Sequence, residues 1–142
     1  MEILQYAKEY DLIVVTHAGL DVAFKEKIHC PPERALHLLK KVPHSKLVLA
    51  HMGVGSGTNY DEVEQMLCGE DVYFDTAYVL RFIGKDNFNR LLKRHGADRI
   101  LFATDSPWSD IQGDVNIIKS FDLDSQTQNK IFYENAKALL GI

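Results

Sequence analysis

The chain has 142 residues, of which 46% are hydrophobic and 25% charged, a composition typical of one globular domain with a buried core. Its formal net charge of −4 provides no broad basic surface, so neither nucleic acid nor an anionic membrane is an expected partner. No apolar stretch approaches the roughly 20 residues of a membrane-spanning helix, and the charged segment MEILQYAKEYD is not a secretory signal. We therefore expect a cytoplasmic protein in which Cys30 and Cys68 are free thiols.

The predicted secondary structure follows from the spacing of apolar residues and from the residues that flank each run. Apolar runs rich in β-branched residues predict strands, and helical spacing between prolines, capping residues and glycines predicts helices. In chain order these patterns predict a helix at 1–9, a strand at 11–17, a helix at 31–43, a strand at 46–51, a helix at 58–69, a strand at 71–75, a helix at 86–96, a strand at 98–105 and helices at 113–120 and 124–142, with a break in the middle of the last one left open. This alternation is typical of an α/β fold with a parallel sheet.

Each of the four predicted strands ends on an ionisable side chain. These are His17, His51, Asp75 and Asp105, and the histidines stand in similar segments, VVTHAG and LVLAHMG. Because the C-terminal ends of parallel strands meet at one edge of the sheet, we expect these side chains to lie close together. A single histidine at a strand end is more often structural, but imidazoles and carboxylates together are ligands that zinc and similar ions prefer. The pattern therefore predicts a metal site whose ligands converge from neighbouring strands.

Five segments of the chain resemble the C-terminal half of the amidohydrolase superfamily, in particular its amidohydrolase-2 group of metal-dependent hydrolases and decarboxylases. They are VVTHAG, LVLAHMG, VYFDTAY, RILFATDSPW and ENAKALLGI. The resemblance covers nearly the whole chain in the same order, and RILFATDSPW is its most specific part. That family folds as a (β/α)8 barrel. The resemblance implies that residues 1–142 form a single partial domain, strands five to eight of a TIM-like barrel.

The resemblance also implies a role for three of the strand-end residues. His17 corresponds to a metal ligand on the fifth barrel strand, and Asp105 to an eighth-strand metal ligand that can take a proton from water. His51 corresponds to the sixth-strand histidine, which contacts the metal-bound water or the substrate and in some relatives binds a second metal. The implied ligands of a divalent metal, zinc or manganese, are thus His17, His51 and Asp105. The implied catalytic residues are Asp105, as proton acceptor, and His51, as the group that polarises a carbonyl.

The implied reaction is hydrolysis of an amide or ester, or decarboxylation of a small carboxylic acid. The family's first strand supplies an HxH pair to the same metal, however, and no HxH occurs in this sequence. A complete barrel of this kind takes about 250 residues. The chain is therefore interpreted as a fragment, a truncated gene product or one part of a split enzyme, and activity of the chain alone is open.

Half a barrel would expose two sheet edges and an apolar inner face. We therefore expect a homo-oligomer, in which two copies close a barrel, or pairing with a complementary N-terminal half. The alternative function is that of a self-associating half-barrel without catalysis. A further alternative is a flavodoxin-like, anion-binding module, which rests on the glycines at positions 53, 55 and 57 before a predicted helix.

Four further residues are weaker candidates for the site. His29 follows the first strand and could contact substrate, although an ordinary loop histidine is the somewhat more common case. Arg81 could pair with a substrate carboxylate or form a surface ion pair, and Trp108 could line a pocket or pack. Asp75 could orient a ligand histidine or cap the turn that follows it.

Overall fold

The computed structural model of the chain describes residues 2–24, 26, 28–44, 46–56 and 59–142. Its strands are β1 (Val14–Thr16), β2 (Leu47–Leu49), β3 (Tyr73–Asp75) and β4 (Ile100–Leu101). Its α-helices are α1 (Glu2–Glu9), α2 (Pro32–Lys41), α3 (Tyr60–Met66), α4 (Leu80–His95), α5 (Ile111–Lys119), α6 (Ser125–Asn129) and α7 (Asn135–Leu140). The predicted alternation of strands and helices is thereby confirmed. None of the described helices is long and apolar enough to cross a membrane.

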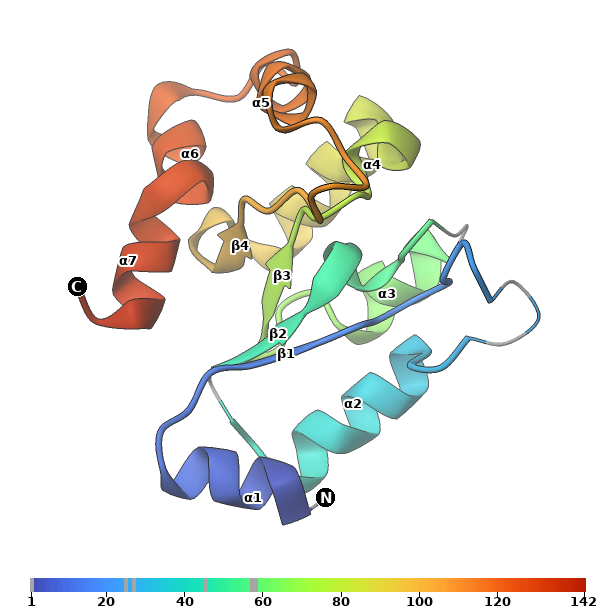
Figure 1. Cartoon of the computed structure of the whole chain (residues 1–142), viewed down its shortest axis with the longest axis vertical. Coiled ribbons are helices and arrows are strands. Elements are labelled where there is room, and N and C mark those ends of the chain that lie inside the picture. Colours follow the sequence, from blue (N-terminus) through green and yellow to red (C-terminus); the bar gives the residue numbers. More distant parts are fainter. Residues whose placement is uncertain (1, 25, 27, 45, 57–58) are drawn as a thin grey trace.

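The four strands form one parallel sheet in the order β1-β2-β3-β4 (Figure 1). Each strand thus pairs with the strand that follows it in the chain, as in a β/α barrel. A flavodoxin-like sheet would instead place its second strand outside the first, in the order 2-1-3-4. The flavodoxin-like alternative is therefore wrong, because β2 lies between β1 and β3 and not on the outer side of β1.

One face of the sheet is covered by helices, most completely over β2, β3 and β4. Its side chains alternate with those of the other face along each strand, and the register of the strands brings Leu49, Phe74 and Ile100 side by side. These three side chains are 0% exposed. Burial of such side chains stabilises the fold by about 1.5–3 kcal/mol each. The covering helices contact one another in chain order, α2 with α3, α3 with α4 and α4 with α5.

The opposite face of the sheet is only partly covered. Val15, Val48 and Tyr73 lie in one row on this face, because Val15 is paired with Val48 and Val48 with Tyr73. Val15 is 63% exposed and Tyr73 is half-buried, whereas Val48 is buried. Within the described residues, β1 and β4 each pair with one strand only. The fold therefore has the open edges and the partly exposed inner face expected of a partial barrel.

The elements differ from the prediction mainly at their ends. The strands are shorter than predicted: all four begin later, and β1, β2 and β4 also end earlier, where the following residues leave the sheet and form loops of the site. Helix α4 begins at Leu80 rather than at 86, since Gly84, with φ of 66°, interrupts the helical pattern that would have predicted the first turn. The break left open within 124–142 is a turn of π-helix, Lys130–Glu134. Position 58, where the third helix was predicted to begin, lies outside the described residues.

Candidate active site

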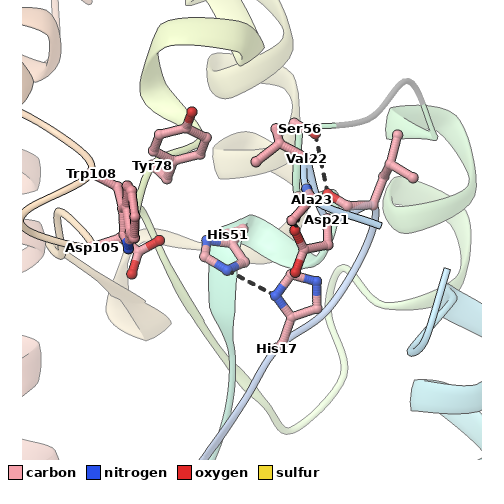
Figure 2. Close-up of a pocket in the computed structure, with 11 residues that line it drawn as sticks. His17, Asp21, Val22, Ala23, His51, Ser56, Tyr78, Asp105 and Trp108 are labelled. Atoms are coloured by element: carbon pink, nitrogen blue, oxygen red, sulfur yellow. Dashed lines mark hydrogen bonds between the residues drawn. The ribbon is translucent and has the colours of Figure 1, made fainter. Parts of the chain in front are cut away.

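A pocket of about 310 Å³ lies at the C-terminal ends of the strands. It is lined by His17, Leu20, Asp21, Val22, Ala23, His51, Gly55, Ser56, Tyr78, Asp105 and Trp108. Figure 2 shows His51 in the middle of this group, with His17 and Asp21 on one side and Tyr78, Trp108 and Asp105 on the other. Three of the four predicted strand-end residues therefore share one pocket. The fourth, Asp75, does not line the pocket but accepts a hydrogen bond from the backbone amide of His51.

The two histidines of the repeated segments are in direct contact. Nε2 of His51 lies 3.1 Å from Nδ1 of His17, and Nδ1 of His51 lies 2.8 Å from the carbonyl oxygen of Ala77. A carbonyl oxygen can only accept, so Nδ1 of His51 carries a proton and donates it to Ala77. In the neutral ring Nε2 is then an acceptor, and Nδ1 of His17 donates to it.

In this chain of hydrogen bonds the proton of His17 is on Nδ1, so its Nε2 is unprotonated and has a free lone pair. The atom is buried and has no hydrogen-bond partner within the described part of the chain. Burial lowers the pKa of His17, and the neighbouring His51 lowers it further, so the ring is neutral at pH 7. A buried, unprotonated imidazole nitrogen without a partner is suited to bind a metal ion.

The loops that follow β1 and β2 are in backbone contact beside the two histidines, through a parallel bridge between Leu20 and Gly55. Gly19 and Gly55 have positive φ angles of 83° and 61°, and the amide of Leu20 donates to the carbonyl of Val54 at 3.3 Å. A Cβ atom on Gly19 would lie 2.2 Å from the carbonyl carbon of Val54, and one on Gly55 would lie 2.2 Å from the carbonyl oxygen of Leu20. Gly19, two residues after His17, and Gly55, four residues after His51, are therefore needed for the two loops to approach this closely.

Three residues of the pocket have left-handed backbone conformations although they carry side chains. His51, Tyr78 and Asp105 have φ angles of 59°, 60° and 59°. Such conformations cost about 1–3 kcal/mol each and are concentrated at functional sites. All three follow strand ends, where this conformation turns the chain sharply and directs its side chain toward the pocket.

Asp75 does not line the pocket but holds its backbone. The side chain is 7% exposed, and Oδ1 accepts hydrogen bonds from the amides of His51 at 2.9 Å and Ala77 at 3.1 Å. Burial raises the pKa of this carboxyl group, while the two amide hydrogen bonds oppose the increase. Asp75 thus both orients a site histidine and caps the turn that follows, the two roles between which the sequence left a choice.

Asp105 lies across the pocket from His17. It is exposed, and its carbonyl accepts a hydrogen bond of 2.9 Å from the amide of Trp108, whose side chain is 73% exposed and lines the pocket. Among residues 2–24, 26, 28–44, 46–56 and 59–142, no group of three His, Cys, Asp or Glu side chains is close enough to hold one ion. The trio His17, His51 and Asp105 therefore shares a pocket without forming a closed set of ligands, and its metal-binding role stays a prediction.

The weaker candidates are placed differently. Arg81 is exposed, donates to Ser109 Oγ at 2.9 Å and lies over the Tyr78 ring at 5.1 Å, behind the pocket wall and not among its lining residues. Ser109 in turn donates to the buried Asp114 at 2.5 Å. His29 is exposed and packs edge-on against Phe24 outside the pocket lining.

Three polar residues of the pocket were not predicted. Asp21 lies four residues after His17, Ser56 five residues after His51 and Tyr78 three residues after Asp75, all in loops that follow strands. None belongs to a periodic pattern, and loop conformation cannot be predicted from spacing. Their position after strand ends was the only signal that could have identified them.

The sequence of the chain was compared with models of known protein families. A family model described as amidohydrolase matches residues 1–142. The chain belongs to the amidohydrolase family. This confirms the resemblance read from the strand-end segments. None of the curated proteins with which the chain was compared is significantly similar to it.

Solved amidohydrolase structures share the fold at low sequence identity. A dihydroxybenzoic acid decarboxylase from Polaromonas, with bound manganese and the inhibitor 2-nitroresorcinol, is 17% identical with a TM-score of 0.69, over 99% of this chain and 53% of that one. A 5-carboxyvanillate decarboxylase from Novosphingobium aromaticivorans, complexed with manganese, is 16% identical with a TM-score of 0.69, over 99% and 51%. A protein described as a probable 2-pyrone-4,6-dicarboxylic acid hydrolase from Acinetobacter baumannii, with citric acid bound, is 15% identical with a TM-score of 0.71, over 99% and 57%.

This amidohydrolase chain thus spans about half the length of the solved structures that it matches. The structural neighbours are barrel enzymes, so the predicted α/β fold, with parallel β/α units forming part of a (β/α)8 barrel, is confirmed. The assignment of its strands to positions five to eight of the barrel rests on the resemblance of the strand-end segments and stays a prediction.

The pocket contains side chains of the types that bind divalent ions, but too few of them lie close together to hold an ion on their own. The unpartnered Nε2 of His17 is a suitable imidazole ligand, and Asp105 and Asp21 provide carboxylates in the same pocket. Because the described residues hold no group of three such ligands, an ion here would need further ligands from outside this chain.

Proposed function

We propose that this chain carries the C-terminal half of the active site of a metal-dependent hydrolase or decarboxylase that acts on a small carboxylic acid. The observation that carries the proposal is the contact of 3.1 Å between His17 and His51, from consecutive strand ends, in a pocket that also contains Asp105. Membership of the amidohydrolase family supports the same reaction class. The substrate determines which bond is broken: an amide bond, an ester bond or the bond between a carbon atom and a carboxylate group.

The metal ligands that this chain offers are His17 and Asp105. His17 would bind the ion through its buried Nε2 and Asp105 through its carboxylate, with the remaining ligands supplied from outside the chain. When bound, a divalent ion polarises the oxygen atoms of water and substrate. Manganese, present in two structural neighbours, and zinc are the candidate ions.

The remaining pocket residues select the substrate and move protons. Leu20, Val22, Tyr78 and Trp108 give an apolar and aromatic lining that suits a ring, and the neighbouring decarboxylases are named for ring carboxylic acids. Asp105, which is exposed in the pocket, would accept a proton from water or substrate.

The charge of the pocket makes binding of an acid dependent on the cation. Asp21 and Asp105 both line it, and none of its described lining residues is a lysine or arginine. Two carboxylates repel a carboxylic acid substrate unless a cation offsets their charge. The divalent ion would therefore recruit the substrate as well as activate it.

The test of the proposal is metal binding by the purified chain. We expect manganese or zinc to bind to protein prepared without a chelator or a metal-binding tag, and the His17→Ala variant to lose this binding because it lacks the buried, unpartnered Nε2 of that ring. The measurement is calorimetric titration with each ion, together with elemental analysis.

The matched control for this experiment is His37→Ala, which removes an exposed histidine of α2 that does not line the pocket. It is expected to bind metal like the wild type. Equal binding by the His17→Ala and His37→Ala variants would contradict the proposed ligand, and wild-type protein that binds neither ion would contradict metal binding by the residues of this chain alone.

The second candidate function is a self-associating half-barrel without catalysis. It is favoured by Val15, which is 63% exposed in the open row of the sheet, and by the unpaired sides of β1 and β4 in the described structure. We propose that a second copy covers this face and closes the barrel. The two functions are compatible, because closure would also exclude water from the pocket.

Self-association predicts a dimer of twice the chain mass of 16.1 kDa. Val15→Lys should yield monomers, since it places a charge in the middle of the apolar contact. Light scattering coupled to size exclusion measures both masses. A wild type that is monomeric at all concentrations would rule out the second copy, and a complementary half-barrel segment would then be the remaining occupant of this face.

A further inference from the structure

His51 is held at two separate points, its backbone and its ring. Its amide donates to Oδ1 of Asp75 at 2.9 Å, which fixes the left-handed backbone with φ of 59°. Its ring nitrogen Nδ1 donates to the carbonyl oxygen of Ala77 at 2.8 Å. With both points fixed, the ring has one orientation in which its other nitrogen, Nε2, is directed toward His17 in the pocket (Figure 2).

Asp75 holds the backbone of His51 directly and the carbonyl that accepts from the His51 ring indirectly. The same oxygen that accepts from the amide of His51 also accepts from the amide of Ala77, at 3.1 Å. The peptide that presents the carbonyl to the His51 ring is therefore tied to the residue that holds the His51 backbone. The carboxyl group is 7% exposed, so water does not compete strongly for these hydrogen bonds.

We propose that Asp75 is a positioning residue that fixes His51 as the tautomer with its proton on Nδ1, so that His51 presents an acceptor lone pair from Nε2 to the pocket. This inference rests on the proposed function for its catalytic meaning, although the tautomer itself does not depend on a metal or a substrate. The carbonyl of Ala77 dictates the tautomer, and Asp75 holds that carbonyl in place through the Ala77 amide.

The tautomer changes the role of His51 in the reaction. To polarise a carbonyl, as the sequence analysis predicted, a neutral histidine must donate an N–H to the substrate. With its only proton on Nδ1, the neutral His51 can instead accept a proton or bind through Nε2. His51 is thereby assigned as an acceptor, either of a proton from water or substrate or of the N–H of His17.

The experiment measures the tautomer by nitrogen NMR on the metal-free, substrate-free protein at neutral pH. In the wild type we expect the His51 proton on Nδ1 and slow hydrogen exchange at the amides of His51 and Ala77. In Asp75→Ala we expect the ring to shift toward the form protonated on Nε2, and both amides to exchange at least about tenfold faster, because each loses its only acceptor. In Asp75→Asn the side-chain oxygen can still accept from both amides, so the wild-type tautomer should be retained.

A control separates positioning from a general loss of stability. Asn135 is also buried and also holds backbone, donating to the carbonyls of Ala97 at 2.6 Å and Ile100 at 2.8 Å, but it does not line the pocket. Asn135→Ala should lower the melting temperature without changing the His51 tautomer or the two amides.

Two results would overturn the inference. The first is a wild-type His51 protonated on Nε2 or rapid exchange of both amides in the folded protein, and this result needs no variant. The second is a folded Asp75→Ala that keeps the wild-type tautomer. Because no metal is added, a chain that binds no metal could still give the expected tautomer, so failure of the proposed function and failure of this inference are distinguishable.

Discussion

Replacing Gly19 or Gly55 with alanine is expected to lower the free energy of unfolding by about 4 kcal/mol, through backbone strain and steric overlap together. The added Cβ would lie 2.2 Å from backbone atoms of Val54 or Leu20, respectively, and neither loop can move without breaking the contact between them. Urea unfolding followed by circular dichroism measures the loss. Any folded variant should also lose the contact between the two site histidines, since the loops that carry them are forced apart.

Gly84→Ala is the control for this prediction. Gly84 also has a positive φ, 66°, but a Cβ at this position meets no atom within 4 Å. Its substitution therefore carries only the backbone cost, about 2 kcal/mol. If the substitutions at Gly19 and Gly55 lower the free energy of unfolding no more than the one at Gly84, the close contact between the two loops is contradicted.

Acidification from pH 6.5 to pH 4 is expected to remove about 3 kcal/mol of stability through His95 alone. His95 is half-buried, with its ring against that of Phe74 and the centroids 4.4 Å apart; its Nδ1 accepts from the Gly69 amide and its Nε2 donates to the Val72 carbonyl. Burial lowers the pKa of His95 from 6.5 to about 4. Both ring nitrogens are used in the neutral form, so the folded state resists protonation.

The direction of this effect follows from proton uptake. Above pH 6.5 the ring is neutral in both states and the contribution is complete, whereas between pH 6.5 and 4 the unfolded chain binds a proton that the folded chain does not. The measurement is the difference in unfolding free energy between wild type and His95→Asn from pH 8 to pH 4. A difference that stays constant over this range would show that His95 is not the group responsible.

The strand ends and the order of elements could be predicted from sequence because they depend on local patterns. Apolar runs mark strands, and His17, His51 and Asp105 follow three of them at the same edge of the parallel sheet, so their convergence could be expected from the sheet. The family resemblance rested on these same segments. Where the pattern was interrupted, as at Gly84 in α4, the prediction missed the first turn of the helix.

The contacts within the site could not be predicted, because they depend on non-repetitive loop conformations. The sequence places a glycine after each histidine but does not indicate that Gly19 meets the other loop, nor that His51 itself is left-handed. The tautomer of His51 depends on a carbonyl 26 residues away in the chain. Asp21 and Tyr78 were missed for the same reason, as single residues in irregular loops.

The order of the strands bears on how the molecule is assembled during synthesis. Because β1, β2, β3 and β4 pair in the order in which they are translated, each new strand can add to an existing edge, and none must insert between two others. The pocket, by contrast, gains its groups one strand at a time, first His17, then His51 and last Asp105. A ribosome-bound chain can therefore have most of its sheet, and Asp21 of the pocket, while still lacking Asp105, and the site is complete only once the last strand has joined.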